Sequence, residues 1–213
     1  MLPGRFVLAD EARKARHRLF LSTLVYPLHF AVILTLALRT GRYLEAAAFT
    51  LAGLFSWTLM EYFVHRYILH GRFPDGPGLQ HLLHRQFDHL HLEHHARPWD
   101  GNHVNGTLKD TALPAAVLMI LALAAGPIQT WPLFMAAMLL GYIMEEWVHH
   151  SVHFCNFKGR YFRYIKRHHL FHHSPRGSEA GYGLTSGLWD MIVGTRIGRA
   201  DRLRLYGGGA LLH

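Results

Sequence analysis

The sequence predicts an all-α integral membrane protein with four apolar helices in two hairpins and a cytoplasmic helical cap that carries clustered histidines. Three observations support this prediction. Four apolar runs lie along the 213-residue chain. Hydrophobic residues make up 50% of it and charged residues 17%, against about 25% charged in an average soluble domain. Most of the 19 histidines lie in the polar segments after the second and fourth runs. Because mean hydropathy is only +0.07, a substantial polar part must lie outside the lipid.

The first two apolar runs predict a helical hairpin. We expect residues 1–18 to form a basic arm and residues 19–213 to form a single membrane-embedded domain. The run 19–38 has no formal charge. At about 1.5 Å per residue it matches a hydrocarbon core about 30 Å thick. After a tight connector, the run 44–63 carries acidic residues only at its two ends.

Three single residues carry further information, two of them in the first apolar run. Pro27 predicts a kink in the first run, because proline removes a helical hydrogen bond. His29 is the one polar exception within that run, and we expect it to be structural. Cys155 is the only cysteine of the sequence, so neither an internal disulfide nor a thiolate metal cluster can form.

Two shorter apolar runs, 112–125 and 133–144, predict the second hairpin. They are separated by a break that contains Pro127 and Pro132. Each run alone is shorter than the roughly 20 residues that cross a bilayer upright. The sequence leaves open whether these helices cross at a tilt or enter the membrane only partway.

The charge distribution predicts the topology. Basic residues are abundant in the N-terminal arm and after the fourth run, whereas the turn between the third and fourth runs has no charge. The positive-inside rule therefore places both termini and both histidine-rich segments on the cytoplasmic side. This topology accounts for the net charge of +8 and the isoelectric point near 9.9. We expect no nucleic-acid partner, because no basic stripe with interleaved aromatic residues lies outside this pattern.

Four histidine clusters with helical spacing predict a metal site. Neutral imidazole is the commonest metal ligand, and residues three or four apart share one face of a helix. The clusters lie after the second run, in an HLEHH motif, after the fourth run and in an HLFHH motif. Together they supply ten candidate ligands: His65, His70, His91, His94, His95, His149, His153, His169, His172 and His173.

The number of histidines predicts two ions. Neighbours such as His94 and His95 point about 100° apart around a helix, so one ion cannot easily bind both. The same holds for His172 and His173. A single tetrahedral zinc ion would need only four ligands. We therefore expect a dinuclear site in which each adjacent pair is divided between the two ions.

Acidic residues near the clusters are candidates to orient the ligand rings. A carboxylate that accepts an N–H from a ligating imidazole fixes the orientation of the ring. Four glutamates are placed for this outer role, namely Glu61, Glu93, Glu145 and Glu146. Three aspartates are weaker candidates, namely Asp88, Asp100 and Asp190. Because imidazole suits iron, zinc, copper and nickel alike, the ligands do not identify the metal.

At these motifs the sequence resembles the fatty acid hydroxylase (sterol desaturase) superfamily of integral membrane, non-haem di-iron enzymes. The resemblance covers about residues 61–195. It rests on EYFVHRYILH, HLEHH followed by Pro-Trp-Asp, EEWVHHSVH, KRHHLFHH and YGLTSGLWDMIVGT. The last segment is most similar to the fatty acid 2-hydroxylase branch, and we expect its Trp189 and Asp190 to pack it onto the metal layer. Transferred position by position, the family's ligands fall on the same ten histidines. The roles of His89, His150 and His168, which lie beside ligand positions, stay open.

The resemblance implies an oxidoreductase with two iron ions and O2 that hydroxylates an unactivated C–H bond of a membrane lipid. Fatty acyl 2-hydroxylation is the first expectation, although residues 101–113 do not resemble the apolar run of the acyl 2-hydroxylases. Zinc is expected to occupy such a site readily in purified material. Because we expect no fused haem module, electrons would come from a separate donor of the cytochrome b5 or ferredoxin type. The lipid and the oligomeric state stay open.

Three alternatives remain. A sterol or carotenoid oxidase or desaturase of the same superfamily would use the same oxidant. A histidine-rich membrane metal transporter would need polar groups along a path through the membrane, and the predicted spans are nearly free of them. A b-type haem electron carrier needs few histidines and leaves the two HxxHH motifs unexplained.

Overall fold

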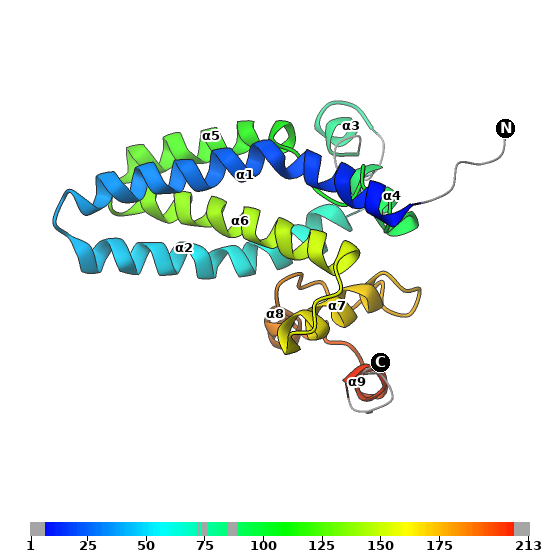
Figure 1. The fold of residues 1–213 in the computed structure, drawn as a ribbon. Coiled ribbons are helices and arrows are strands. Elements are labelled where there is room, and N and C mark those ends of the chain that lie inside the picture. The colour runs from blue at the N-terminus through cyan, green and yellow to red at the C-terminus, as the bar shows by residue number, and fades with distance from the viewer. Residues whose placement is uncertain (1–6, 72, 74–75, 85–88, 207–213) are drawn as a thin grey trace.

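Four long helices run beside one another, and the shorter helices gather at one end of them (Figure 1). This computed structural model describes residues 7–71, 73, 76–84 and 89–206. Every regular element in these ranges is a helix, as the sequence predicts. The long helices are α1 (Leu8–Leu38), α2 (Tyr43–Phe63), α5 (Leu108–Ala125) and α6 (Trp131–Phe154). They form the two expected hairpins, α1 with α2 and α5 with α6.

The shorter elements surround one end of this bundle (Figure 1). A π-helical turn, η1 (Val64–Leu69), continues α2, and π-turns of this kind are frequent at functional sites. The others are α3 (Leu79–Leu83), α4 (His89–Ala96), α7 (Arg160–His172), α8 (Leu188–Val193) and α9 (Arg199–Tyr206).

Three helical segments are long and apolar enough to cross a membrane: α1, α2 together with η1, and α5. The fourth helix, α6, is longer than its predicted apolar run, because it continues through Glu145, Glu146, His149 and His153. These polar residues are buried. They are tolerated because α6 lies inside the bundle, where polar side chains face protein and not lipid.

The helices α2 and α6 approach closely at a glycine. A Cβ atom at Gly53 would lie 2.4 Å from the carbonyl oxygen of Phe134 and 2.8 Å from the Cβ of Ala137. Only glycine therefore fits at this crossing, and the close contact fixes the position of α6 relative to α2. Further along the bundle, Ile33, Met119 and Leu133 form an apolar core between the helices.

The residues expected as a basic arm form, from Leu8 onwards, the first turns of α1. Ala12 and Ala15 are buried there. The Glu11 carboxylate accepts the backbone N–H of Gly101 (2.9 Å), and Arg18 Nε donates to the carbonyl of Asn105 (3.0 Å). The start of α1 is thus packed against the segment between α4 and α5. Residues 1–6 of the arm lie outside the described residues.

Candidate metal centre

The ten predicted ligands converge where the bundle meets the short helices. Four separate elements supply them: the end of α2 with η1, helix α4, the last turns of α6, and α7. On α4, α6 and α7 the ligands lie three or four residues apart, which places them on one side of each helix, whereas His65 and His70 lie five residues apart along the π-helical turn η1. The α7 face shows this most clearly, because His169 and His172 are fully buried whereas Tyr161 on the same helix is half exposed.

The histidines form two groups of five, and in each group the candidate ligand atoms lie within 4.8 Å of one another. The adjacent pairs are divided between the groups as the helical geometry predicts, so His94 and His95 lie in different groups, and so do His172 and His173. The first group comprises His65, His70, His91, His95 and His172, and the second comprises His94, His149, His153, His169 and His173.

The spacing of the ring nitrogens fits the coordination sphere of a metal ion. In the first group the Nε2 atom of His91 lies 3.1 Å from that of His65 and 2.9 Å from that of His70. In the second group His169 Nε2 lies 2.9 Å from His153 Nε2 and 3.0 Å from His173 Nε2. With metal–nitrogen bonds of about 2.1 Å, ligands 90° apart are about 3.0 Å from each other and tetrahedral ligands about 3.4 Å. The observed spacing matches five or six ligands better than four.

Hydrogen bonds on the far side of two rings set their tautomers. His65 Nδ1 lies in hydrogen-bonding contact with the carbonyl oxygen of Tyr182, and His172 Nδ1 lies 2.9 Å from that of Ala180. A carbonyl can only accept, so in both rings Nδ1 carries the proton. The Nε2 lone pair of each ring is then directed into the first group, where a metal ion would bind it.

Burial keeps the ligand rings uncharged. It is the largest cause of the low pKa values of His91, His94 and His169, each well below the ordinary histidine value, and of the pKa of about 3 of His95, which His172 and His70 also lower. The neighbouring histidines contribute to these shifts in the same direction. Since only neutral imidazole binds a metal, rings with such low pKa values are suited to cations and not to protons.

Two of the predicted outer glutamates, Glu61 and Glu146, hold loop segments through hydrogen bonds. Glu61 accepts the backbone N–H groups of Leu184 (2.8 Å) and Thr185 (2.7 Å). Glu146 accepts Asn105 Nδ2 (2.7 Å) and the N–H of Gly106 (3.2 Å). The hydrogen bonds of these two carboxylates in the described residues thus go to loop segments, and their role in orienting ligand rings stays a prediction. Both carboxylates accept hydrogen bonds from loops that are distant in the chain. Backbone carbonyls accept the hydrogen bonds of the His65 and His172 rings.

The remaining acidic candidates have separate positions. Glu93 accepts a hydrogen bond from Arg97 Nε (3.0 Å) at the surface. Asp100 lies 3.1 Å from His103, which lines the cavity beside the histidines. Glu145 is buried and lines a cavity beside the histidines. Asp190 is fully buried. Asp88 lies outside the described residues.

Of the extra histidines, His150 is buried against Trp147 and His168 lies 3.3 Å from Asp190. Neither belongs to the two groups of five. The side chain of His89 lies outside the described part of the structure. Sequence reasoning missed the carbonyls of Ala180 and Tyr182, because a backbone acceptor leaves no signal in residue type.

A cavity of about 200 Å³ touches both groups. His91 lines it from the first group, and His94 and His149 line it from the second. Its other walls combine apolar and acidic side chains, including Trp57, Leu184, Tyr142, Glu145 and Glu146. A ligand in this cavity would therefore be close to both candidate metal positions.

Comparison with known proteins agrees with this geometry. A sequence model of the family described as fatty acid hydroxylase matches residues 50–195, which include all ten histidines. The dihydroceramide fatty acyl 2-hydroxylase FAH2 of Arabidopsis thaliana is 35% identical over 145 residues, which are 67% of this chain and 58% of the relative. The fatty acid 2-hydroxylase of Rattus norvegicus is 30% identical over 146 residues, 68% of this chain and 38% of the relative.

A solved structure described as full-length scs7p, with only the hydroxylase domain visible, has the same fold. It superposes with a TM-score of 0.70 at 27% identity, over 84% of this chain and 65% of that one. The chain thus spans less than two thirds of the length of these relatives.

We predict that His172→Ala and His94→Ala each lower the metal content of the purified protein from about two ions per chain toward one. Each substitution removes a ligand from a different group of five. Elemental analysis after dialysis against a weak chelator measures the loss. The control is His103→Ala. His103 lines the same cavity and pairs with Asp100, but it belongs to neither group of five, so both ions should stay bound. Full metal content in His172→Ala or His94→Ala would remove that residue from the ligand set.

Proposed function

Because this chain belongs to the fatty acid hydroxylase family, we propose that it is a di-iron membrane hydroxylase that acts on a lipid. The reaction consumes O2, two electrons and two protons, converts a C–H bond to C–OH and releases one water molecule. The preferred target is carbon 2 of a fatty acyl chain, as the names of the relatives indicate for those proteins. The observation that carries the proposal is the pair of five-histidine groups beside one shared cavity.

The ten histidines would hold two iron ions, which supply the activation of O2. Imidazole also binds zinc, so zinc is expected in protein purified without added iron. Zinc has no redox chemistry and cannot support hydroxylation. The protein binds the ions, positions the lipid and excludes water, while the metals carry the difficult chemistry. Electrons would come from a separate donor protein of the cytochrome b5 or ferredoxin type.

The protein is integral to the membrane, and we propose that the metal centre faces the cytoplasm. The basic residues that follow α6 and those near the start of α1 lie at the same end of the bundle as the histidines (Figure 1). The positive-inside rule assigns that end to the cytoplasm. A lipid could then keep its tail in the bilayer while its polar head lies near the metals.

An apolar groove of about 370 Å³ between α1 and α5 is suited to the acyl tail. Val25, Ala112, Ala116 and Ile120 are among its lining residues. The groove borders the metal cavity: Tyr26, which lines the groove, shares a hydrogen bond of 2.6 Å with Thr111, which lines the cavity. Carbon 2 lies next to the polar head of a lipid, so a tail that extends away from the metals along this groove fits 2-hydroxylation.

The alternative of a metal transporter is less well supported. Transport needs polar groups along a path across the membrane. The bundle core beyond the metal centre is instead built from Ile33, Ala37, Met119 and Leu133. A sterol or carotenoid oxidase or desaturase of the same superfamily would use the same centre, so its product distinguishes it.

We predict that expression of the chain with a suitable electron donor adds one oxygen atom to one class of acyl lipid. Lipid mass spectrometry under ¹⁸O2 should show a mass increase from the labelled oxygen at carbon 2 of the chain. His94→Ala should abolish this product while inserting normally in the membrane. A product that has lost two hydrogen atoms would identify a desaturase instead. An oxygenated sterol or carotenoid would show that the substrate is not an acyl lipid.

We predict that Ala116→Trp shifts the products toward shorter acyl chains, because the indole fills the proposed tail groove. Leu118→Trp is the matched control, since Leu118 is exposed on the same helix but does not line the groove. The chain-length distribution of hydroxylated lipids, measured by mass spectrometry, should change only for Ala116→Trp. If the two variants give the same distribution, the tail does not lie in this groove.

A further inference from the structure

We propose that the loop of residues 180–187, held by Asp190, orients the ligands of the first histidine group only, so that the two metal positions differ in affinity. This inference rests on the proposed two-metal centre. Asp190 would be a positioning residue, because it acts on the metal ligands through the loop and does not belong to either group itself.

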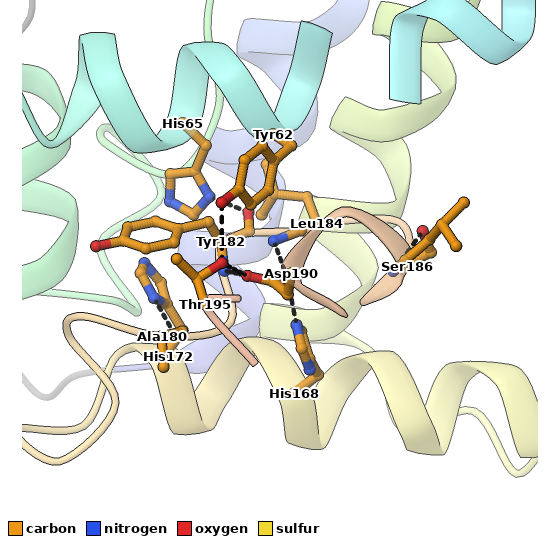
Figure 2. Close-up of polar contacts among 12 residues, drawn as sticks. Tyr62, His65, His168, His172, Ala180, Tyr182, Leu184, Ser186, Asp190 and Thr195 are labelled. Carbon is orange, nitrogen blue, oxygen red and sulfur yellow. Dashed lines mark hydrogen bonds and ion pairs between the residues drawn. The ribbon is translucent and has the colours of Figure 1, made fainter. Parts of the chain in front are cut away.

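The loop contacts two ligands of the first group. After α7 the chain folds back beneath the end of α2, so that Ala180 and Tyr182 lie beside the rings of His172 and His65 (Figure 2). The carbonyl of Ala180 accepts the Nδ1 proton of His172 at 2.9 Å, and the carbonyl of Tyr182 accepts that of His65. Such bonds fix the ring orientation and make the opposite nitrogen more basic, which strengthens metal binding.

Asp190 fixes the position of this loop. One of its carboxylate oxygens accepts the backbone N–H of Tyr182 (2.9 Å) and the hydroxyl of Thr195 (2.7 Å), and the other accepts the N–H of Gly183 (2.9 Å). Residue 182 is therefore held through its N–H by Asp190 while its carbonyl holds His65. A shift of the loop away from Asp190 would move that carbonyl directly.

The carboxylate is well suited to this task. Burial alone would raise the pKa of Asp190, but hydrogen bonds from His168, Gly183 and Thr195 keep the pKa below its ordinary value. Asp190 is therefore ionised, and charged acceptors form stronger hydrogen bonds than neutral ones. Glu61 holds the next part of the same loop through the N–H groups of Leu184 and Thr185. Two buried carboxylates from different helices thus fix the loop from two sides.

The second group has no comparable support among the described residues. Four of its rings, those of His94, His153, His169 and His173, have a buried Nδ1 atom without a hydrogen-bond partner there. Their orientation comes from the packing of α4, α6 and α7 and, for His153, from a ring contact with Trp99. If the loop is no longer held in place, metal binding should weaken in the first group and stay nearly unchanged in the second.

The test compares the wild-type full chain with Asp190→Asn in detergent, both loaded with iron. The amide keeps the size of the carboxylate but replaces one accepting oxygen by a donor. Asp201→Asn is the matched control. It is the same substitution of aspartate by asparagine, but Asp201 pairs with the exposed Arg176 (2.8 Å) and makes no hydrogen bond or ion pair with the described loop of residues 180–187. Bound iron is measured by elemental analysis against increasing chelator, and Mössbauer spectra of ⁵⁷Fe report the two positions separately.

We expect one ion of Asp190→Asn to be lost at about 10- to 100-fold lower chelator concentration than in the wild type, the range typical of residues that orient a metal ligand. One Mössbauer component should disappear first. Combined with His94→Ala, the substitution should leave almost no iron, whereas combined with His172→Ala it should add little further loss. Thr195→Val, which removes one hydrogen bond to Asp190, should have a smaller effect in the same direction and serves if Asp190→Asn does not fold.

Equal loss of both ions, or unchanged iron in Asp190→Asn and Thr195→Val, would overturn the inference while leaving the two-metal centre intact. Fewer than two ions in the wild type after loading would overturn the inference together with the proposed centre. Because the readout is bound metal, a failure to hydroxylate any lipid would count against the proposed reaction alone.

Discussion

The structure depends on the convergence of ten neutral imidazole rings in one buried region. Neutral imidazole rings that direct Nε2 lone pairs at one another repel, and Nε2 atoms of these rings lie 2.9–3.1 Å apart in both groups. Such an arrangement is expensive unless cations bind the lone pairs. Two metal ions would satisfy these lone pairs, and they would join four helical elements that are separate in sequence.

The other features of the fold follow from placing this centre at one end of a membrane bundle. Helix α6 lies at the centre of the bundle, in contact with α1, α2 and α5. It extends from the apolar part of the bundle to the metal centre, where it supplies His149 and His153. The close contact of Gly53 with Phe134 brings α6 against α2, which carries His65. The cavity beside the histidines and the apolar groove between α1 and α5 then lie one after the other along the bundle. This order suits a lipid that presents its head end to the metals.

Local geometry explains how much the sequence could predict. The division of His94 from His95, and of His172 from His173, follows from the 100° step of a helix, so it was available without a structure. The apolar runs and the family resemblance were equally visible, and the match over residues 50–195 confirms the resemblance. By contrast, the partners of Glu61 and Glu146 lie 123 and 40 or 41 positions away in the chain. The carbonyls that orient His65 and His172 depend on loop conformation, which residue spacing does not encode. The packing of the start of α1 likewise depends on contacts of Glu11 with Gly101 and of Arg18 with Asn105, which lie 90 and 87 positions away in the chain.

Anomalous X-ray scattering at the iron edge, from crystals of the iron-loaded protein, tests the central claim most directly. A dinuclear centre predicts two separate iron peaks, one within the group that contains His65 and His172 and one within the group that contains His94 and His169. A single peak, or iron bound away from these ten histidines, would contradict it.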